Sequence, residues 1–191
     1  MSKIKISDFV PDMQSFMRTM YSIRQDIKLL PTKEHICTCI EYNDLLELRD
    51  DFIRHLVGSV IRYVYSSTKR EDLRKSFSES GIDVADIELH ILDKVKSKFR
   101  ISNIKGQFSE LLLYNLLIFH FSAIPLIRKM PITTSPGVER HGADAIHIAN
   151  DEDKYILYLG EAKTYTSGFK PAFVKALDSI LKTFLDHRNE L

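Results

Sequence analysis

Apolar residues recur with two different periods along this chain, and the change of period separates helices from strands. Helical spacing predicts helices at part of 8–30, at 43–65, 83–98 and 104–121, and from 172 to about 188. Short runs rich in β-formers predict strands at 34–41, 126–134, 144–149 and 155–159. This order predicts an α/β fold with a short mixed sheet and flanking helices.

The most informative pattern is a predicted hairpin with acidic residues at matching positions of its two strands. A polar segment at 150–154 separates the two β-rich runs. If the turn is centred between residues 152 and 153, antiparallel pairing places Asp144 opposite Glu161, with Cβ atoms roughly 5 Å apart. Lys163 follows two positions after Glu161 and points from the same face. We therefore expect these three side chains to form one cluster.

The chemistry of that cluster suits a divalent cation. Two carboxylates at that distance repel each other unless a cation lies between them. Mg²⁺ prefers oxygen ligands and keeps water in its other positions, so Asp144 and Glu161 are candidate ligands. Such an ion contacts phosphate and acidifies a water, while a nearby lysine orients that water or stabilises the transition state. The alternative is a solvated hairpin with scattered charges, because Glu-x-Lys alone is a weak signal.

Residues 104–121 are apolar on almost every side, which predicts a buried helix. Glu110 is the lone acidic residue in this segment, and a buried acid is rarely tolerated without a partner. We expect that partner to be the metal ion or Lys163. The alternative is a surface position near the helix start, where the helix dipole favours an acid.

Three phrases of the sequence resemble a known family. They occupy residues 106–112, 141–147 and 159–165 and contain Glu110, Asp144, and Glu161 with Lys163, respectively. With the predicted order of elements, they resemble the restriction-endonuclease-like, or PD-(D/E)XK, superfamily. Within it they are similar to the HamA nuclease subunits of the Hachiman anti-phage systems. The resemblance covers mainly residues 104–190.

This resemblance implies a Mg²⁺-dependent DNase, with Mn²⁺ able to substitute, that acts on DNA together with a superfamily 2 helicase of the HamB type. Glu110, Asp144 and Glu161 would be the metal-binding acids and Lys163 the lysine of the motif. It also implies a restriction-endonuclease-like core at 104–191, preceded by a mostly helical extension at 1–103 with one strand.

The sequence departs from the superfamily pattern at two places. Ala143 precedes Asp144, where the superfamily name has proline. The sequence given stops at Leu191, shortly after the last predicted helix, where the family core usually adds another strand. We therefore expect a core that is truncated at its C-terminal end or completed differently.

The composition gives no sign of autonomous nucleic-acid binding. The 191 residues include 27 basic and 26 acidic ones, for a net charge of +1. Without a global basic field, the chain is expected to rely on a partner or on local basic patches. The first residues lack the apolar run of a signal peptide, so we expect a cytoplasmic protein with no membrane association.

Cysteine usage also indicates a cytoplasmic protein. The two cysteines, Cys37 and Cys39, are expected to point to opposite faces of their strand, without a disulfide, as small buried side chains in a reducing compartment.

The segment 66–81 holds the most basic patch of the first half, with Lys69, Arg70, Arg74 and Lys75. A solvated mobile connection is one interpretation, and a phosphate or partner contact is the other. Further candidates for phosphate contact, with a solvated turn as the alternative, are Lys129, Arg140 and His141.

Two hypotheses can be drawn from these patterns. The leading one is a metal-dependent DNA endonuclease that uses Glu110, Asp144, Glu161 and Lys163. The second is a catalytically inactive, nuclease-like scaffold that docks a helicase or another protein, which the balanced charge and the missing last strand favour.

Overall fold

The computed structural model describes most of the chain. The described residues are 13–25, 34–43, 46–99, 104–128, 143–151 and 154–165, with the helical positions 174–175, 177–178, 181–182 and 185. Lys129, Arg140, His141 and most of the last predicted helix lie outside them. Residues 11–59 form one unit, and residues 60–191 with 1–10 form the other. The predicted boundary between residues 103 and 104 stays a prediction.

The described elements are five helices and small antiparallel sheets, which confirms the α/β class. None of these helices combines the length and apolarity needed to cross a membrane.

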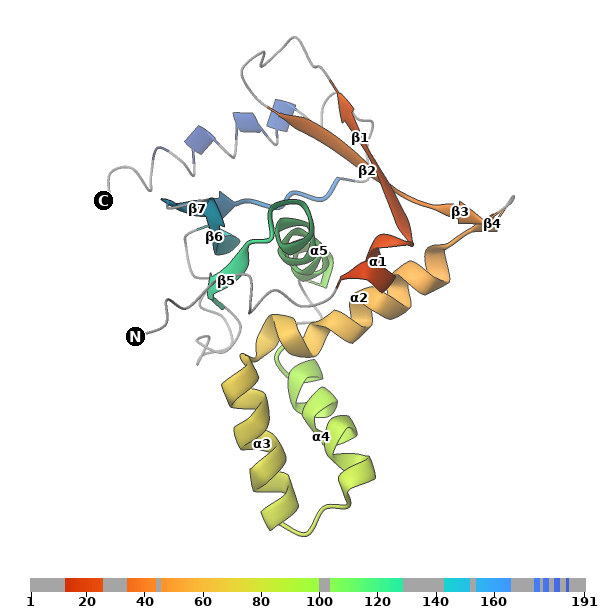
Figure 1. Ribbon diagram of the computed structural model, residues 1–191, viewed down its shortest axis with the longest axis vertical. Coiled ribbons are helices and arrows are strands. Elements are labelled where there is room, and N and C mark those ends of the chain that lie inside the picture. The colour runs from red at the N-terminus through yellow and green to blue at the C-terminus, as the bar shows by residue number, and fades with distance from the viewer. Residues whose placement is uncertain are drawn as a thin grey trace. The chain divides into compact units, whose positions relative to one another are not determined.

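The unit formed by residues 11–59 is built around an antiparallel strand pair. It contains α1 (Gln14–Met17), β1 (Met20–Gln25), β2 (His35–Ile40), β3 (Tyr42–Asn43), β4 (Leu46–Glu47) and the first part of α2 (Arg49–Val64). β1 and β2 lie side by side, with Met20 opposite Ile40 and Gln25 opposite His35 (Figure 1). Phe16 stacks on Phe52 with ring centroids 5.6 Å apart, which anchors α1 to α2.

This unit departs from the sequence predictions in its strands. The described residues before 104 include four strands instead of the one that was predicted. Among the described residues of the helix predicted within 8–30, only Gln14–Met17 are helical, and Met20 begins β1. The β-forming run after Met20 pairs along its length with β2, and this pairing overrides the helical spacing.

Two further details correct the predictions. α2 begins at Arg49 instead of near residue 43, because residues 42–43 pair with residues 46–47 before the helix. The sulfur atoms of Cys37 and Cys39 lie 3.7 Å apart. The expectation of opposite faces was wrong, because alternate positions of a strand share a face.

In the second unit, residues 66–81 form an ordered helix and its caps, and the interpretation as a mobile connection was wrong. α3 (Ser67–Glu79) is capped by Ser66, whose hydroxyl accepts the N–H of Lys69 at 3.2 Å. Gly81, with φ of +79°, ends the helix while the N–H of Ile82 reaches the Phe77 carbonyl at 3.1 Å. These two caps and a sequence without internal glycine or proline explain the helix.

α4 (Val84–Lys96) runs beside α3, as Figure 1 shows. The side chain of Asp83 accepts the N–H of Ala85 at 2.8 Å and caps the helix start. Ile87, Ile91 and Val95 form its buried stripe. The predicted helix at 83–98 is therefore confirmed.

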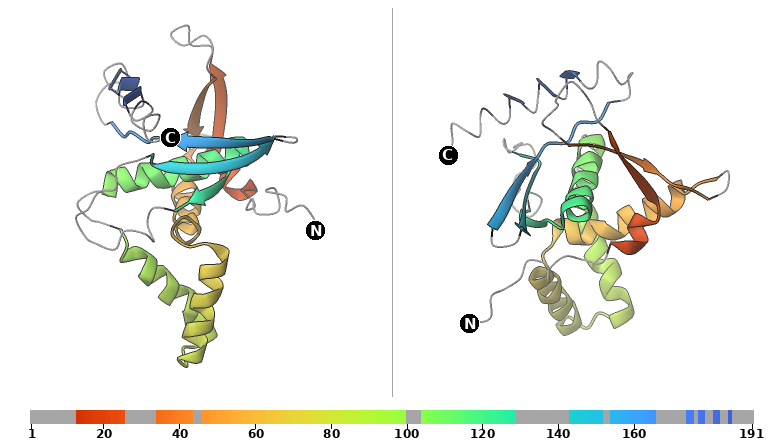
Figure 2. Two further views of the ribbon diagram at one scale, coloured as in Figure 1. Left: turned by 90° about the vertical axis from the view of Figure 1, so that its left-hand side faces the viewer. Right: turned by 45° about the horizontal axis from the view of Figure 1, so that its top comes forward.

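The same unit contains a helix packed on a three-stranded sheet. α5 (Ile104–Phe121) lies against β5 (Ile124–Ile127), β6 (Ala145–Asp151) and β7 (Lys154–Gly160), which pair in the order β5-β6-β7 (Figure 2). Both pairings are antiparallel, so the predicted mixed sheet is wrong for the described strands. The tight link between β6 and β7 allows only antiparallel pairing. Pro125, which has no N–H, lies in β5, an edge strand of the described sheet, where proline is tolerated.

The register of β6 and β7 matches the predicted hairpin. The pairs run from Asp151 opposite Lys154 to Ala145 opposite Gly160. This register centres the turn between residues 152 and 153, as the sequence predicts. Asp144 immediately precedes β6 and Glu161 immediately follows β7, so both acids lie at the same end of the hairpin.

Candidate active site

Gly160 allows α5 to approach the end of the hairpin closely. A Cβ atom on Gly160 would lie 3.0 Å from Leu113 Cδ2 on α5 and 3.3 Å from the Cβ of Ala145. Such contacts are tighter than ordinary van der Waals separation, so glycine suits this position. The residue after this close contact is Glu161, one of the candidate site residues.

A hydrogen bond joins the two strand ends beyond the last ladder pair. Asp144 Oδ2 accepts the backbone N–H of Ala162 at 2.9 Å. Ala162 lies between Glu161 and Lys163, so this bond holds Asp144 beside both. An acceptor that is a carboxylate makes the bond charge-assisted and therefore stronger than an ordinary amide bond.

Lys163 completes the group. Its Nζ donates a hydrogen bond to Glu161 Oε1 at 2.6 Å. This bond raises the pKa of Lys163, partial burial opposes the rise, and the charges of Glu161 and Asp144 add to it. The lysine is therefore held as a cation beside both acids. The structure thus brings together Asp144, Glu161 and Lys163 as the sequence predicts, while their chemical roles stay a prediction.

Glu110 has a hydrogen-bond partner that the sequence did not reveal. The buried Tyr63, at the end of α2, donates from its hydroxyl to Glu110 Oε2 at 3.1 Å. Burial raises the pKa of Tyr63, and the negative charges of Glu110 and Asp144 raise it further. Tyr63 is therefore a protonated donor near both acids. No local pattern could have found it, because the two residues are 47 positions apart.

A second contact connects α5 to the segment after β7. The hydroxyl of Ser109 is hydrogen-bonded to the hydroxyl of Thr164. Each of these residues is the immediate neighbour of a candidate site residue, Glu110 in one case and Lys163 in the other. The contact therefore helps to fix the helix that carries Glu110 against the strand end that carries Lys163.

The donor set meets part of what a divalent metal requires. Asp144 and Glu161 offer hard carboxylate oxygens on adjacent strand ends, which fits Mg²⁺ because it is commonly bound by one or two carboxylates and several waters. Among the residues that the structure describes, no three His, Cys, Asp or Glu side chains are grouped closely enough to hold a metal. The fit to a divalent metal therefore rests on the carboxylates of Asp144 and Glu161. Glu110 is hydrogen-bonded to Tyr63.

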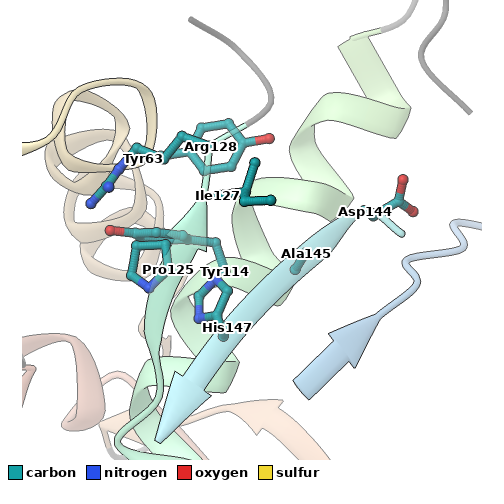
Figure 3. Close-up of a pocket in the computed structure, with 8 residues that line it drawn as sticks. All are labelled: Tyr63, Tyr114, Pro125, Ile127, Arg128, Asp144, Ala145 and His147. Carbon is teal, nitrogen blue, oxygen red and sulfur yellow. The ribbon is translucent and has the colours of Figure 1, made fainter. Parts of the chain in front are cut away.

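A small pocket adjoins this group. Asp144, Tyr63, Tyr114, Arg128 and His147 are among its lining residues. Figure 3 shows the hydroxyl of Tyr63 directed to the side of Asp144, and the hydroxyl of Tyr114 and the guanidinium of Arg128 directed to the opposite side. The pocket wall thus has an acidic end and a basic end.

His147 belongs to the floor of this pocket. It is 1% exposed, and its Nδ1–H donates to the carbonyl of Ala123 at 3.0 Å. Burial lowers its pKa, which the bond to Ala123 partly opposes. Tyr114 packs edge-on against the imidazole with centroids 5.4 Å apart. His147 is thus a core residue.

Comparison with known proteins gives one match. A family model described as HamA matches residues 15–191, which is nearly the whole chain. This match supports a role in anti-phage defence. No curated protein and no solved structure matches the chain.

Proposed function

Because this chain belongs to the HamA family, we propose that it is a metal-dependent DNA endonuclease or DNase subunit of a bacterial anti-phage defence system. Its proposed partner is a superfamily 2 helicase, which would supply the DNA handling that the balanced charge of this chain does not provide. The observation that carries the proposal is the bond from Ala162 N–H to Asp144 Oδ2, which places Asp144 beside the Glu161–Lys163 pair.

The proposal includes a restriction-endonuclease-like core at residues 104–191. Its support is the order of α5, β5, β6 and β7 and the position of the acids at one end of the β6–β7 hairpin. In this proposal, α5 and the antiparallel strands form the frame of the core, and the acids at the strand ends carry its chemistry.

In the proposed reaction, a water oxygen attacks phosphorus, the bond from phosphorus to the leaving oxygen breaks, and the water releases a proton to solvent while the leaving oxygen takes one up. Asp144 and Glu161 would hold Mg²⁺, or Mn²⁺ in its place. When bound, the ion supplies charge neutralisation at the phosphate and a more acidic water. The ammonium of Lys163 stabilises the negative charge that develops on the phosphate oxygens. The hydroxyl of Tyr63 positions the carboxylate of Glu110. In the proposed reaction Glu110 supports the metal ion or Lys163.

Cleavage of plasmid DNA with Mg²⁺, in the presence of the helicase, tests this proposal. Glu161→Gln and Asp144→Asn keep the shape of each side chain and remove its charge, so each is expected to lower cleavage at least roughly 100-fold. Asp93→Asn is the matched control, because Asp93 pairs with Lys96 on the exposed surface of α4 at 3.1 Å. Equal cleavage by all four proteins would refute the assignment.

A second function is a nuclease-like scaffold without activity that docks a helicase. The observation that favours it is that the described residues contain no group of three metal ligands. A calorimetric measurement of Mn²⁺ binding separates the two functions. The nuclease is expected to bind Mn²⁺ and to lose binding in Asp144→Asn. A scaffold binds the helicase tightly and shows neither Mn²⁺ binding nor cleavage.

A further inference from the structure

Three arginines lie near one another, and one of them, Arg128, lines the basic end of the pocket. Arg62 lies near the end of α2, Arg70 near the start of α3, and Arg128 directly after β5. We call them the arginine cluster. In the part of the chain that the structure describes, none of the three forms an ion pair with a carboxylate.

The backbone holds this cluster in place. The carbonyl of Arg62, one of the last of α2, accepts Arg128 Nε–H at 3.3 Å and the hydroxyl of Tyr114 at 3.2 Å. The last carbonyls of a helix have no partner within the helix, so they accept such donors readily. Arg128 and Tyr114 are thereby anchored next to Arg62.

Two donors of the cluster are buried and unsatisfied. The Nε atoms of Arg62 and Arg70 are shielded from solvent and have no hydrogen-bond partner among the described residues. A buried donor without a partner is costly, more so when it is charged. An anion that accepts from these nitrogens would remove that cost.

The surroundings of Arg70 add to the argument. Burial lowers its pKa, and the positive charges of Arg74, Arg62 and Arg128 lower it further. Its place near the N-terminal end of α3 is unfavourable for a cation, because the helix dipole favours an anion there. Arg74 is already paired with Glu88 at 2.7 Å, so it does not need another acid. Like charges, the helix dipole and unsatisfied donors all favour the entry of an anion.

We propose that Arg62, Arg70 and Arg128 form a phosphate-binding subsite, which holds a backbone phosphate of the DNA strand at the basic end of the pocket, away from the Asp144 end. Guanidinium groups match phosphate oxygens with paired N–H donors, which suits this ligand better than a point charge would. Nucleic acid is favoured over an acidic protein segment because Arg128 and Asp144 line one pocket. A strand that presents one phosphate to the acids can present another to the arginines. This inference rests on the proposed function for its ligand but does not require cleavage.

Binding of a fluorescent single-stranded oligonucleotide to the full chain, measured with EDTA over a series of salt concentrations, tests the subsite. Each lost phosphate contact is expected to lower the slope of log affinity against log salt by roughly 0.7. Arg70→Gln is expected to show this change and roughly tenfold weaker binding at fixed salt. Arg70→Lys keeps the charge without the paired donors, so its affinity is expected to lie between those of wild type and Arg70→Gln. The same measurement on Arg128→Gln tests the residue that follows β5 instead of α3. Circular dichroism verifies that this variant is folded.

The matched control is Arg54→Gln, which removes the same charge from an arginine already paired with Asp51 at 2.7 Å. Its salt slope is expected to equal that of the wild type. Equal slopes for wild type, Arg70→Gln and Arg54→Gln would overturn the subsite. Stabilisation by inorganic phosphate without any oligonucleotide binding would overturn the assignment to nucleic acid. Variants that bind the oligonucleotide normally but lose the helicase would assign the cluster to an acidic protein segment instead.

The subsite and the proposed function can fail separately. If wild type never cleaves with Mg²⁺ but the salt slopes differ as expected, the nuclease proposal fails and the subsite stands. If wild type cleaves and the slopes are equal, the subsite fails and the nuclease proposal stands.

Discussion

The hydroxyl of Tyr63 donates to Glu110 Oε2 at 3.1 Å, and this bond joins the end of α2 to α5. Tyr63 is also packed against Tyr114, with ring centroids 5.4 Å apart in an edge-on arrangement. The hydroxyl therefore cannot turn away without disturbing the aromatic contact. A residue far from the acidic motif in sequence thus fixes one of its acids.

Tyr63→Phe is expected to keep the ring contacts and to remove the donor that positions Glu110. Unfolding free energy should fall by about 1 kcal/mol, as for a typical hydrogen bond. If Glu110 serves the reaction, kcat should fall roughly 10- to 100-fold with KM little changed, because misplacement of a positioning group costs rate more than binding. Plasmid cleavage at several DNA concentrations gives both constants. Tyr155→Phe, at an exposed position of β7, is the control, and a fall in kcat for both variants would contradict the role.

The hairpin could be predicted because its information is local. Alternation in two short runs and a polar turn between them define the register, and the register places Asp144 opposite Glu161. α4 and α5 were predictable for the same reason, since a periodic apolar stripe marks α4 and a long, almost uniformly apolar run marks α5.

The remaining features depend on contacts between distant segments. Tyr63 reaches Glu110 only because the last turn of α2 lies beside α5. Met20 lies in a strand because β2 pairs with it, although its spacing from Met13 and Phe16 is helical. Arg70 belongs to a cluster only through Arg62 and Arg128, which come from other elements. Single-sequence patterns do not contain these contacts.

Lys163 should remain charged over the working pH range. Its bond to Glu161 raises its pKa above the ordinary lysine value of about 10.4, so its contribution to folding is complete below that pH and is lost as pH rises through the folded pKa. Cleavage is expected to show no lysine-dependent fall between about pH 7 and 10. Lys163→Gln should lower cleavage roughly 100-fold at every pH in that range. A pH profile in which the two proteins converge at high pH would mean that Lys163 titrates earlier than expected.

His147 should make the fold sensitive to acid. Burial lowers its pKa below the ordinary value of about 6.5, so the unfolded chain binds the proton more readily. Stability is therefore full above about pH 6.5 and decreases as pH falls through the interval between the unfolded and folded pKa values. His147→Gln does not titrate and can still donate to the carbonyl of Ala123.

Urea unfolding at a neutral and at a mildly acidic pH measures this effect. The unfolding free energy should change less between the two pH values for His147→Gln than for wild type. The same difference in both proteins would assign the acid sensitivity to other groups.

Gly160 and Leu113 should be coupled, because a Cβ on Gly160 would lie only 3.0 Å from Leu113 Cδ2. Gly160→Ala is expected to lower unfolding free energy by about 1–3 kcal/mol, since the leucine or the strand must move. It should also lower cleavage, because Glu161 is the next residue. Leu113→Ala removes the obstructing methyl groups, so the double variant should be more stable than the sum of the two single effects, by about 0.5–3 kcal/mol.

A cycle of urea unfolding experiments on the four proteins measures this coupling, and plasmid cleavage on the same set shows whether activity returns with it. Gly58→Ala is the control: a Cβ there meets nothing within 4 Å, and the position lies inside α2. It should stabilise the chain by up to about 1 kcal/mol, because alanine is the better helix former. If the changes in unfolding free energy for Gly160→Ala and Leu113→Ala are additive, the packing of α5 against the end of β7 is not coupled through these two residues. Restored stability without restored cleavage would separate the packing role of Gly160 from any effect on the acid beside it.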